Sequence, residues 1–408
     1  MTYGKLLGGA AALAIVAGSA GADTLRVTVA EYSEKTGPYF EAAADAFEKA
    51  NPEHEINIEV VPWNNMLQKL TTDISAGANA DLSIIGTRWL IDFVDQDIVA
   101  PLDEFMNDEF RSRFIPAFFE PAVMQGDTYG LPIAASARAM YYNKDLLAEA
   151  GLDGPPESWA ELKDAAMAID ALGEDISGYG MQGAEIETDV YFYYAFWAHG
   201  GELVQEDGTS GLDSEAGYRA AELYRSLIEA DATQPGVTSY SREDVQNLFK
   251  QGRVGMMITA PFLSSQIAEE APDLNYGVAP IPAGPKGDRG TYAVTDSIVM
   301  FANSDNKELA WEFLDLLFSN EWRKKFTAGE GFLPVNNAVA DDPVFAEDPD
   351  LKVFASVLPD ARFAPVIKGW EEIADITSNA LQTIYLGNAE VKPTLDAAAA
   401  EINRILAE

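Results

Sequence analysis

The sequence predicts an α/β protein of two domains, built from mainly parallel sheets flanked by helices. A chain of 408 residues is too long for one ordinary hydrophobic core. Hydrophobic residues make up 48% of the chain and are spread along it, which is typical of a globular protein. Runs of β-branched residues alternate with amphipathic runs of helical length, and this order indicates βαβ units.

The first 22 residues have the features of a secretory signal peptide. Lys5 supplies a positive charge, an apolar stretch follows, and Ala20-Gly21-Ala22 forms a cleavage site before Asp23. The apolar stretch is too short to span a bilayer stably. The chain has no cysteine, so neither disulfides nor lipid attachment is possible. We expect a mature protein that is free in the periplasm.

The charge is strongly unbalanced. Asp and Glu number 66 and Lys and Arg 27, giving a formal net charge of −39. Such a chain repels nucleic acid and anionic membrane surfaces, so we expect neither as a partner. We interpret the acidity as a solvated surface, compatible with a saline habitat, rather than as a cation site.

Three strand-helix units open the mature chain. Strands are expected at 25–29, 56–63 and 81–86, and they precede helices at 38–52, 64–79 and 87–97. In parallel sheets, ligands bind beyond the carboxyl ends of the strands. The residues expected on this rim are Glu31, Tyr32, Ser33, Trp63, Thr87, Arg88 and Trp89.

The next unit runs from a tyrosine-rich strand at 139–144 into two helices. Asp145 is expected to cap the first helix and Gly151 to end it. After a Pro-Pro turn, Ser158 and Glu161 form a capping box for the helix at 158–172.

Further strands are expected at 176–183, 254–261 and 292–302. The helices expected here cover 189–201, 215–230, 242–252, 306–327, 371–386 and 392–406. The aromatic residues Tyr193, Phe196 and Trp197 lie within a helix and are expected to be core.

Catalytic signatures are weak. His54 and His199 have no partner at metal-ligand spacing, and no nucleophile elbow is present. Gly178, Gly180 and Gly183 spell G-x-G-x-x-G, but acidic residues crowd the following helix start, so we interpret them as a strand end and turn. Glu187 and Asp189 are the best candidates for a glycosidase pair.

Aromatic residues stand at loop and helix-start positions, where they suit a carbohydrate. Sugars have weakly apolar C–H faces surrounded by hydroxyls, so their binding sites combine aromatic side chains with charged hydrogen-bonding groups. The aromatic candidates are Trp63, Trp89, Tyr191, Phe192, Phe262 and Trp370, and the polar candidates are Glu31, Arg88, Arg138, Asp189 and Asp296.

Two sequence patterns carry a family resemblance. YNKDLL is followed by Gly, two prolines and S-W-x-E-L, and later F-x-x-G-x-x-x-M precedes a small residue, Pro and an aromatic. These patterns resemble the family 1 extracellular solute-binding proteins of bacterial ABC importers, the group that includes maltose-binding protein. The resemblance implies a two-lobe periplasmic binding protein fold, type II, with a multi-strand hinge.

In that family the chain crosses between the lobes about three times, here near Pro132, Ala293 and Gly331. The resemblance therefore implies one lobe of residues 24–132 with 294–330, and a second of 133–293 with 331–408.

The resemblance also assigns ligand-binding roles. It implies roles for Asp189, Tyr191 and Phe192 in the aromatic helix, for Phe262 after TAP and for Trp370 in the segment 361–373. Ser136 and Phe332 lie at two of the crossings and complete the predicted site. Ser136 stands where maltose-binding protein has a ligand-binding Glu, and Ala374 where it has Arg. Both differences argue against a malto-oligosaccharide.

We therefore expect a monomer that holds a sugar or related polyol between two lobes and delivers it to an ABC permease in the inner membrane. No catalysis, cofactor or metal is expected. Two alternatives stay open: the same fold binding a non-sugar osmolyte or a polyamine, and a secreted carbohydrate-active enzyme.

Overall fold

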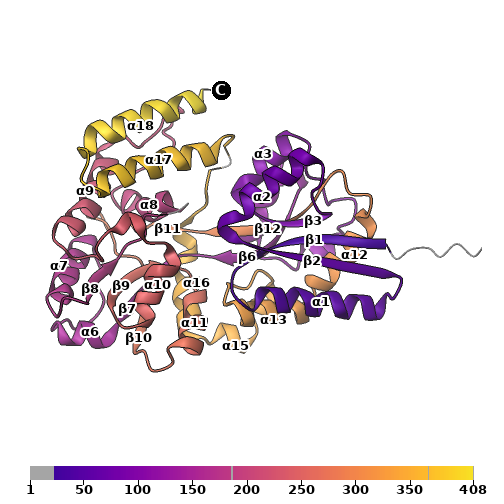
Figure 1. The fold of residues 1–408 in the computed structure, drawn as a ribbon, viewed down its shortest axis with the longest axis horizontal. Helices are drawn as coiled ribbons and strands as arrows, with labels where there is room; N and C mark the ends of the chain where they lie inside the picture. Colours follow the sequence, from indigo (N-terminus) through magenta and orange to yellow (C-terminus); the bar gives the residue numbers. More distant parts are fainter. Residues whose placement is uncertain (1–22, 185–186, 366, 408) are drawn as a thin grey trace, which may run out of the picture.

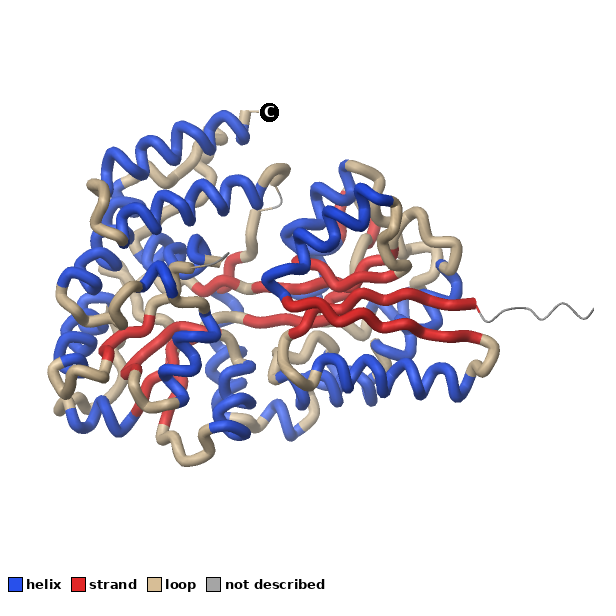
Figure 2. The backbone as a smooth tube through the Cα atoms, viewed as in Figure 1, coloured by secondary structure: helices blue, strands red, loops and turns tan. Residues whose placement is uncertain are grey.

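The computed structural model describes residues 23–184, 187–365 and 367–407, and the predicted signal peptide lies outside them. Two sheets, each covered by helices, form two lobes joined side by side (Figures 1 and 2). The α/β two-lobe fold predicted from the sequence is confirmed.

The sheet of the first lobe has the strand order β2-β1-β3-β12-β6. β1 (Asp23–Glu31) pairs in parallel with β2 (His54–Pro62) and β3 (Leu82–Gly86). β12 (Val294–Met300) is antiparallel both to β3 and to β6 (Leu131–Ser136).

The sheet of the second lobe has the order β10-β7-β9-β8. β7 (Ala139–Asn143) is antiparallel to both β10 (Tyr276–Ala279) and β9 (Val254–Thr259), and β8 (Ser177–Gly180) is parallel to β9. Both sheets are thus mixed, not mainly parallel as predicted. The antiparallel strands β12 and β7 enter their sheets directly from the other lobe, so no helical crossover sets their direction.

The helices cover the faces of the two sheets (Figure 1). In the first lobe these include α1 (Thr36–Ala50), α2 (Trp63–Ala76), α3 (Leu90–Asp95), α12 (Lys307–Leu317) and α13 (Asn320–Glu330). In the second they include α6 (Lys144–Glu149), α7 (Trp159–Asp170), α8 (Thr188–Ala198), α9 (Glu215–Glu229), α10 (Arg242–Lys250), α11 (Phe262–Glu270), α16 (Pro349–Val357), α17 (Trp370–Tyr385) and α18 (Val391–Leu406).

Short elements complete the connections. They are η1 (Thr87–Trp89), η2 (Glu120–Ala122), η3 (Val237–Ser239), η4 (Leu358–Asp360), α4 (Asp108–Arg111), α5 (Pro116–Phe119), α14 (Asn337–Ala340) and α15 (Pro343–Ala346). Two small ladders pair β4 (Val123–Met124) with β5 (Asp127–Thr128) and β11 (Thr291–Tyr292) with β13 (Ala361–Arg362).

Local signals placed several helix ends correctly. The Ser158–Glu161 capping box is present. The first helix of that unit, however, is capped by Asn143, whose side chain accepts from the amides of Asp145 and Leu146. The helix predicted over 306–327 is two helices, because Ser319 leaves helical geometry and caps α13 with its own side chain.

The G-x-G-x-x-G pattern that begins at Gly178 is explained by packing. Gly178 and Gly180 lie in the buried strand β8. A Cβ atom on Gly178 would approach the backbone oxygen of Ala166 in α7 to 1.9 Å. The glycine therefore allows a helix and a strand to pack closely, as the interpretation of a strand end implied.

Two chain segments connect the two sheets. β6 leads through residues 137–138 into β7, and β11 leads through Ala293 into β12, whereas the predicted crossing near Gly331 stays a prediction. β6 stays in the first sheet as far as Ser136, four residues beyond the predicted crossing at Pro132. Among the described residues, no helix combines the length and the apolar character needed to cross a membrane.

Candidate functional site

A cavity of about 340 Å³, here named the main cavity, lies where the two lobes meet. Eight predicted site residues line it: Glu31, Tyr32, Trp63, Ser136, Arg138, Phe262, Asp296 and Phe332. The remaining lining residues are Ser33, Glu34, Pro62, Asn64, Glu187, Arg242, Glu243, Gln266 and Val294.

The first lobe contributes the rim predicted from parallel strand ends. β1 ends at Glu31 and β2 at Pro62, and the two residues are paired in the register of the sheet. Tyr32 and Trp63 follow these ends directly, so both rings reach the cavity.

Aromatic rings form a continuous wall of the cavity. Tyr32 lies with its ring centroid 4.8 Å from that of Phe332 and 6.2 Å from that of Trp63. Phe262, on the second lobe, contacts Phe332 edge to face at 5.6 Å. The wall thus runs from Trp63 and Tyr32 through Phe332 to Phe262, and it offers apolar surface to a ligand.

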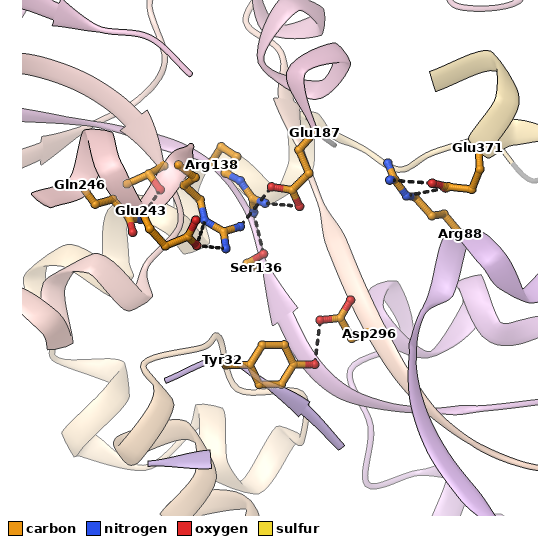
Figure 3. A network of polar contacts seen from close by, with 11 residues as sticks. Tyr32, Arg88, Ser136, Arg138, Glu187, Glu243, Gln246, Asp296 and Glu371 are labelled. Atoms are coloured by element: carbon orange, nitrogen blue, oxygen red, sulfur yellow. Dashed lines mark hydrogen bonds and ion pairs between the residues drawn. The ribbon is translucent and has the colours of Figure 1, made fainter. Parts of the chain in front are cut away.

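A charged network forms a polar part of the cavity lining, and Figure 3 shows its members Ser136, Arg138 and Glu187. Arg242 Nη1 lies 3.0 Å from Glu187 Oε2, and Arg138 Nη2 lies 3.8 Å from Glu187 Oε1. Arg242 Nη2 also lies 2.5 Å from Glu243 Oε1, and Arg138 Nη1 donates to Ser136 Oγ at 2.7 Å.

Glu187 is held as an acceptor in this network. Burial alone would raise its pKa, but Arg242, Arg138 and Arg88 outweigh burial and lower that pKa. Its backbone has φ of 77°, a left-handed conformation unusual for a residue other than glycine. Such strain is typical of positions that a ligand site requires.

Asp296 occupies the floor between the lobes. Tyr32 Oη donates to its Oδ2 at 2.8 Å, as Figure 3 shows. Burial raises the pKa of Asp296 to about 7, although the Tyr32 hydrogen bond opposes this change. At neutral pH this carboxyl can therefore either donate or accept a hydrogen bond.

Two predicted residues, Thr87 and Arg88, line a second cavity of about 40 Å³ beside the main one. Arg88 also joins the two lobes. Its Nε lies 2.7 Å from Glu371 Oε1, and its Nη2 donates to Glu371 Oε2 at 3.0 Å. This bidentate pair connects η1 of the first lobe to the first turn of α17 in the second.

Five predicted site residues line neither cavity: Trp89, Asp189, Tyr191, Phe192 and Trp370. Trp89 is buried and stacks beneath Trp63, with ring centroids 5.2 Å apart, so it supports a lining residue. α8, which holds Asp189, Tyr191 and Phe192, is buried on nearly all sides, and its aromatic side chains pack in the core.

Trp370 lies in the core of the second lobe with 1% of its surface exposed. Gly369 has φ of 72°, and an added Cβ there would lie 2.9 Å from Ile405 Cγ2 in α18. The glycine thus permits close packing of α17 on α18 and turns the indole inward, where its ring lies 6.4 Å from that of Tyr193. This placement differs from the predicted position on the cleft.

The residues that sequence reasoning missed lie mainly on the second lobe. Arg242 follows Ser241, which caps α10 together with Asp244, so its sequence context is that of an ordinary helix start. The sequence suggests Glu187 only as half of a catalytic pair with Asp189. In the structure Glu187 lines both cavities, whereas Asp189 lines neither.

Asp189 predicts a pH dependence of stability. The side chain is 0% exposed, and burial raises its pKa to about 7, although the charge of Arg88 and a hydrogen bond from the Val190 backbone oppose this change. An unfolded aspartate loses its proton near pH 4. Between these values the folded state binds more protons, so this group makes the unfolding free energy fall as pH rises, by at most about 1.4 kcal/mol per pH unit.

We therefore expect Asp189→Asn to flatten the decline in unfolding free energy between pH 5 and 7, measured by urea unfolding. Asp175→Asn, at a side chain 92% exposed, is the matched control and should leave the slope unchanged. Equal slopes for wild type and Asp189→Asn would contradict a buried, protonated Asp189.

Comparisons with known proteins identify the family. The model of the bacterial extracellular solute-binding protein family matches residues 30–324. A binding protein of Brucella abortus (strain 2308) is 64% identical over 401 residues, covering 98% of this chain and 97% of the relative. The maltotriose-binding protein of Pyrococcus abyssi is 28% identical over 334 residues, covering 80% of this chain and 70% of the relative.

Among solved structures, an ABC transporter solute-binding protein from Thermotoga lettingae TMO, bound with α-D-tagatose, matches with a TM-score of 0.88. Its identity is 25%, and the match covers 94% of this chain and 100% of that one. The chain thus belongs to the bacterial extracellular solute-binding proteins.

Proposed function

We propose that this protein binds a sugar or a related polyol between its two lobes, in the periplasm, and delivers it to the permease of an ABC importer without altering it. The observation that carries this proposal is the interlobe cavity, which is lined both by aromatic rings from the two lobes and by charged hydrogen-bonding groups.

The chemistry of the cavity suits neutral, hydroxyl-rich molecules. The rings of Tyr32, Trp63 and Phe262 offer surfaces for C–H groups. Arg138 and Arg242 donate hydrogen bonds, and Glu187 accepts them, so hydroxyls can find both kinds of partner. The tagatose-bound relative and the maltotriose-binding relative support a carbohydrate as the solute class.

The charge of the cavity favours a solute without an anionic group. Five acidic residues line it, namely Glu31, Glu34, Glu187, Glu243 and Asp296, against the two arginines Arg138 and Arg242. A sugar acid would bring a further negative charge into this surrounding. A polyamine is the competing solute that the same excess of carboxylates favours.

A thermal-shift screen of the purified mature chain tests the proposal. The probes are maltose, D-tagatose, D-mannitol, ribitol, glucuronate and spermidine. A solute present at 100 times its dissociation constant adds about 2.7 kcal/mol to the unfolding free energy. We expect a raised melting temperature with at least one neutral sugar or polyol and none with glucuronate.

A raised melting temperature with spermidine alone would replace the sugar with a polyamine. Parallel incubation with a panel of p-nitrophenyl glycosides checks for catalysis, and release of nitrophenol above the buffer rate would contradict a pure binding role.

Two aromatic substitutions distinguish a residue that contacts the solute from a residue that packs in the core. Phe262 is half-buried at the cavity, and the Arg242 guanidinium lies 5.2 Å from its ring centroid. Phe262→Ala should weaken the binding of the tightest probe by roughly 2 to 4 kcal/mol, with a smaller loss of stability.

Trp370→Ala should show the opposite pattern. Removing a core indole should lower the unfolding free energy by about 3 to 5 kcal/mol and change the affinity little. Calorimetric titration and denaturant unfolding of both variants make the comparison. A large loss of affinity with near-native stability in Trp370→Ala would contradict the core role and indicate that Trp370 contacts the solute.

A further inference from the structure

The second cavity extends the main cavity along one crossing segment. The two cavities share Trp63, Glu187, Val294 and Asp296 as lining residues. The second is also lined by Tyr292, Ala293 and Thr295, so the stretch from β11 into β12 forms much of its wall. Its volume of about 40 Å³ is enough for one or two water-sized groups.

Two polar atoms on this stretch, Thr295 Oγ1 and Asp296 Oδ1, have no hydrogen-bond partner among the described residues, whereas the Tyr292 hydroxyl interacts with the Arg88 side chain. Thr295 and Asp296 are 4% and 5% exposed, so solvent does not readily satisfy these two atoms. Buried polar groups left without partners each cost free energy, and folded proteins contain few of them.

Neighbouring polar atoms on the same stretch are satisfied. Thr291 Oγ1 accepts from Arg138 N at 2.9 Å and donates to Arg138 O at 2.7 Å. Ser297 Oγ lies 2.7 Å from Thr87 Oγ1, and the other oxygen of Asp296 accepts from Tyr32. The missing partners on this stretch therefore belong to Thr295 and Asp296, which both line the second cavity.

Tyr292, Thr295 and Asp296 are held firmly in place. The Tyr292 ring stacks on Trp197 with centroids 5.8 Å apart and planes 12° apart. Thr295 and Asp296 pair with Ala135 and Ala134 of β6. If the Asp296 side chain rotated to find a partner for Oδ1, its hydrogen bond to Tyr32 would break. Such a rotation would therefore cost the free energy of that hydrogen bond.

The surrounding charges select a neutral group. A carboxylate entering the second cavity would approach Asp296 and Glu187, and an ammonium would approach Arg88. A hydroxyl can both accept and donate a hydrogen bond, so it suits the Thr295 hydroxyl as well as the Asp296 carboxyl, and it matches the small volume.

We propose that the second cavity is a subsite for a terminal hydroxymethyl group of the solute, with Tyr292, Thr295 and Asp296 as specificity-determining residues. This inference rests on the proposed function, because it assigns one end of the same sugar or polyol.

The test uses Thr295→Val, which keeps the side-chain shape and removes the hydroxyl. The probe is whichever of D-mannitol, ribitol, D-tagatose and maltose binds tightest, compared with its analogue lacking one terminal hydroxyl. On wild type, the analogue should bind at least about 10-fold more weakly, because it leaves buried groups unpaired. On Thr295→Val that difference should shrink to about 2-fold or less.

Thr327→Val is the matched control. Thr327 is likewise buried with an unpartnered Oγ1 among the described residues, but it lines neither cavity. Each Thr→Val change removes an unsatisfied polar atom, so both should raise the melting temperature of the ligand-free protein, by about 1 to 2 °C. Only Thr295→Val should lower the affinity for the intact probe, by about 10-fold.

Failure of the subsite and failure of the proposed function give different results. If wild type binds a probe but Thr295→Val binds it within 2-fold of wild type, the subsite is overturned and the function stands. If none of the four probes raises the melting temperature of wild type, the proposed function fails and the inference fails with it. Tyr292→Phe, measured in the same way, guards against a Thr295→Val variant that does not fold.

Discussion

The pairing of β12 with β6 is the constraint on which the rest of the structure depends. Both strands belong to the sheet of the first lobe, yet each continues directly into the second lobe at the cavity floor. The two hydrogen bonds between Thr291 Oγ1 and the backbone of Arg138 hold the two crossings together just beyond the sheet. Because of this arrangement, Ser136, Arg138 and Asp296 keep fixed relative positions.

Around this floor, each lobe supplies one wall of the cavity. The first contributes Tyr32 and Trp63 from strand ends, and the second contributes Phe262, Arg242 and Glu187 from helix starts. The Arg88–Glu371 ion pair and the bond from Gly369 N to Asp92 Oδ1 join the lobes beside the second cavity. A solute that contacts both walls favours the arrangement in which they approach each other.

The sequence predicted the fold class and the first-lobe half of the site, because both rest on local information. Strand ends are marked by the change from alternating apolar residues to a polar loop, and parallel strands bring such ends to one edge. Tyr32, Trp63, Thr87 and Arg88 follow from that rule. The lobe boundaries remain a proposal.

The second-lobe half depends on packing between distant segments, which local patterns do not encode. The sequence around Arg242 is typical of a capped surface helix, and the sequence around Tyr292 and Thr295 is typical of a buried strand. A glycine before an aromatic helix start fits both a ligand contact and a tight helix–helix contact, and at Trp370 the structure shows the second.

The central claim is that the solute is enclosed by both lobes at once. Hydrogen–deuterium exchange of the mature chain, with and without the tightest-binding sugar or polyol, tests it most directly. Enclosure by both lobes should slow exchange at residues 31–34 and 63–66 of the first lobe together with residues 242–246 and 262–266 of the second. Protection confined to one lobe at saturating solute would contradict it.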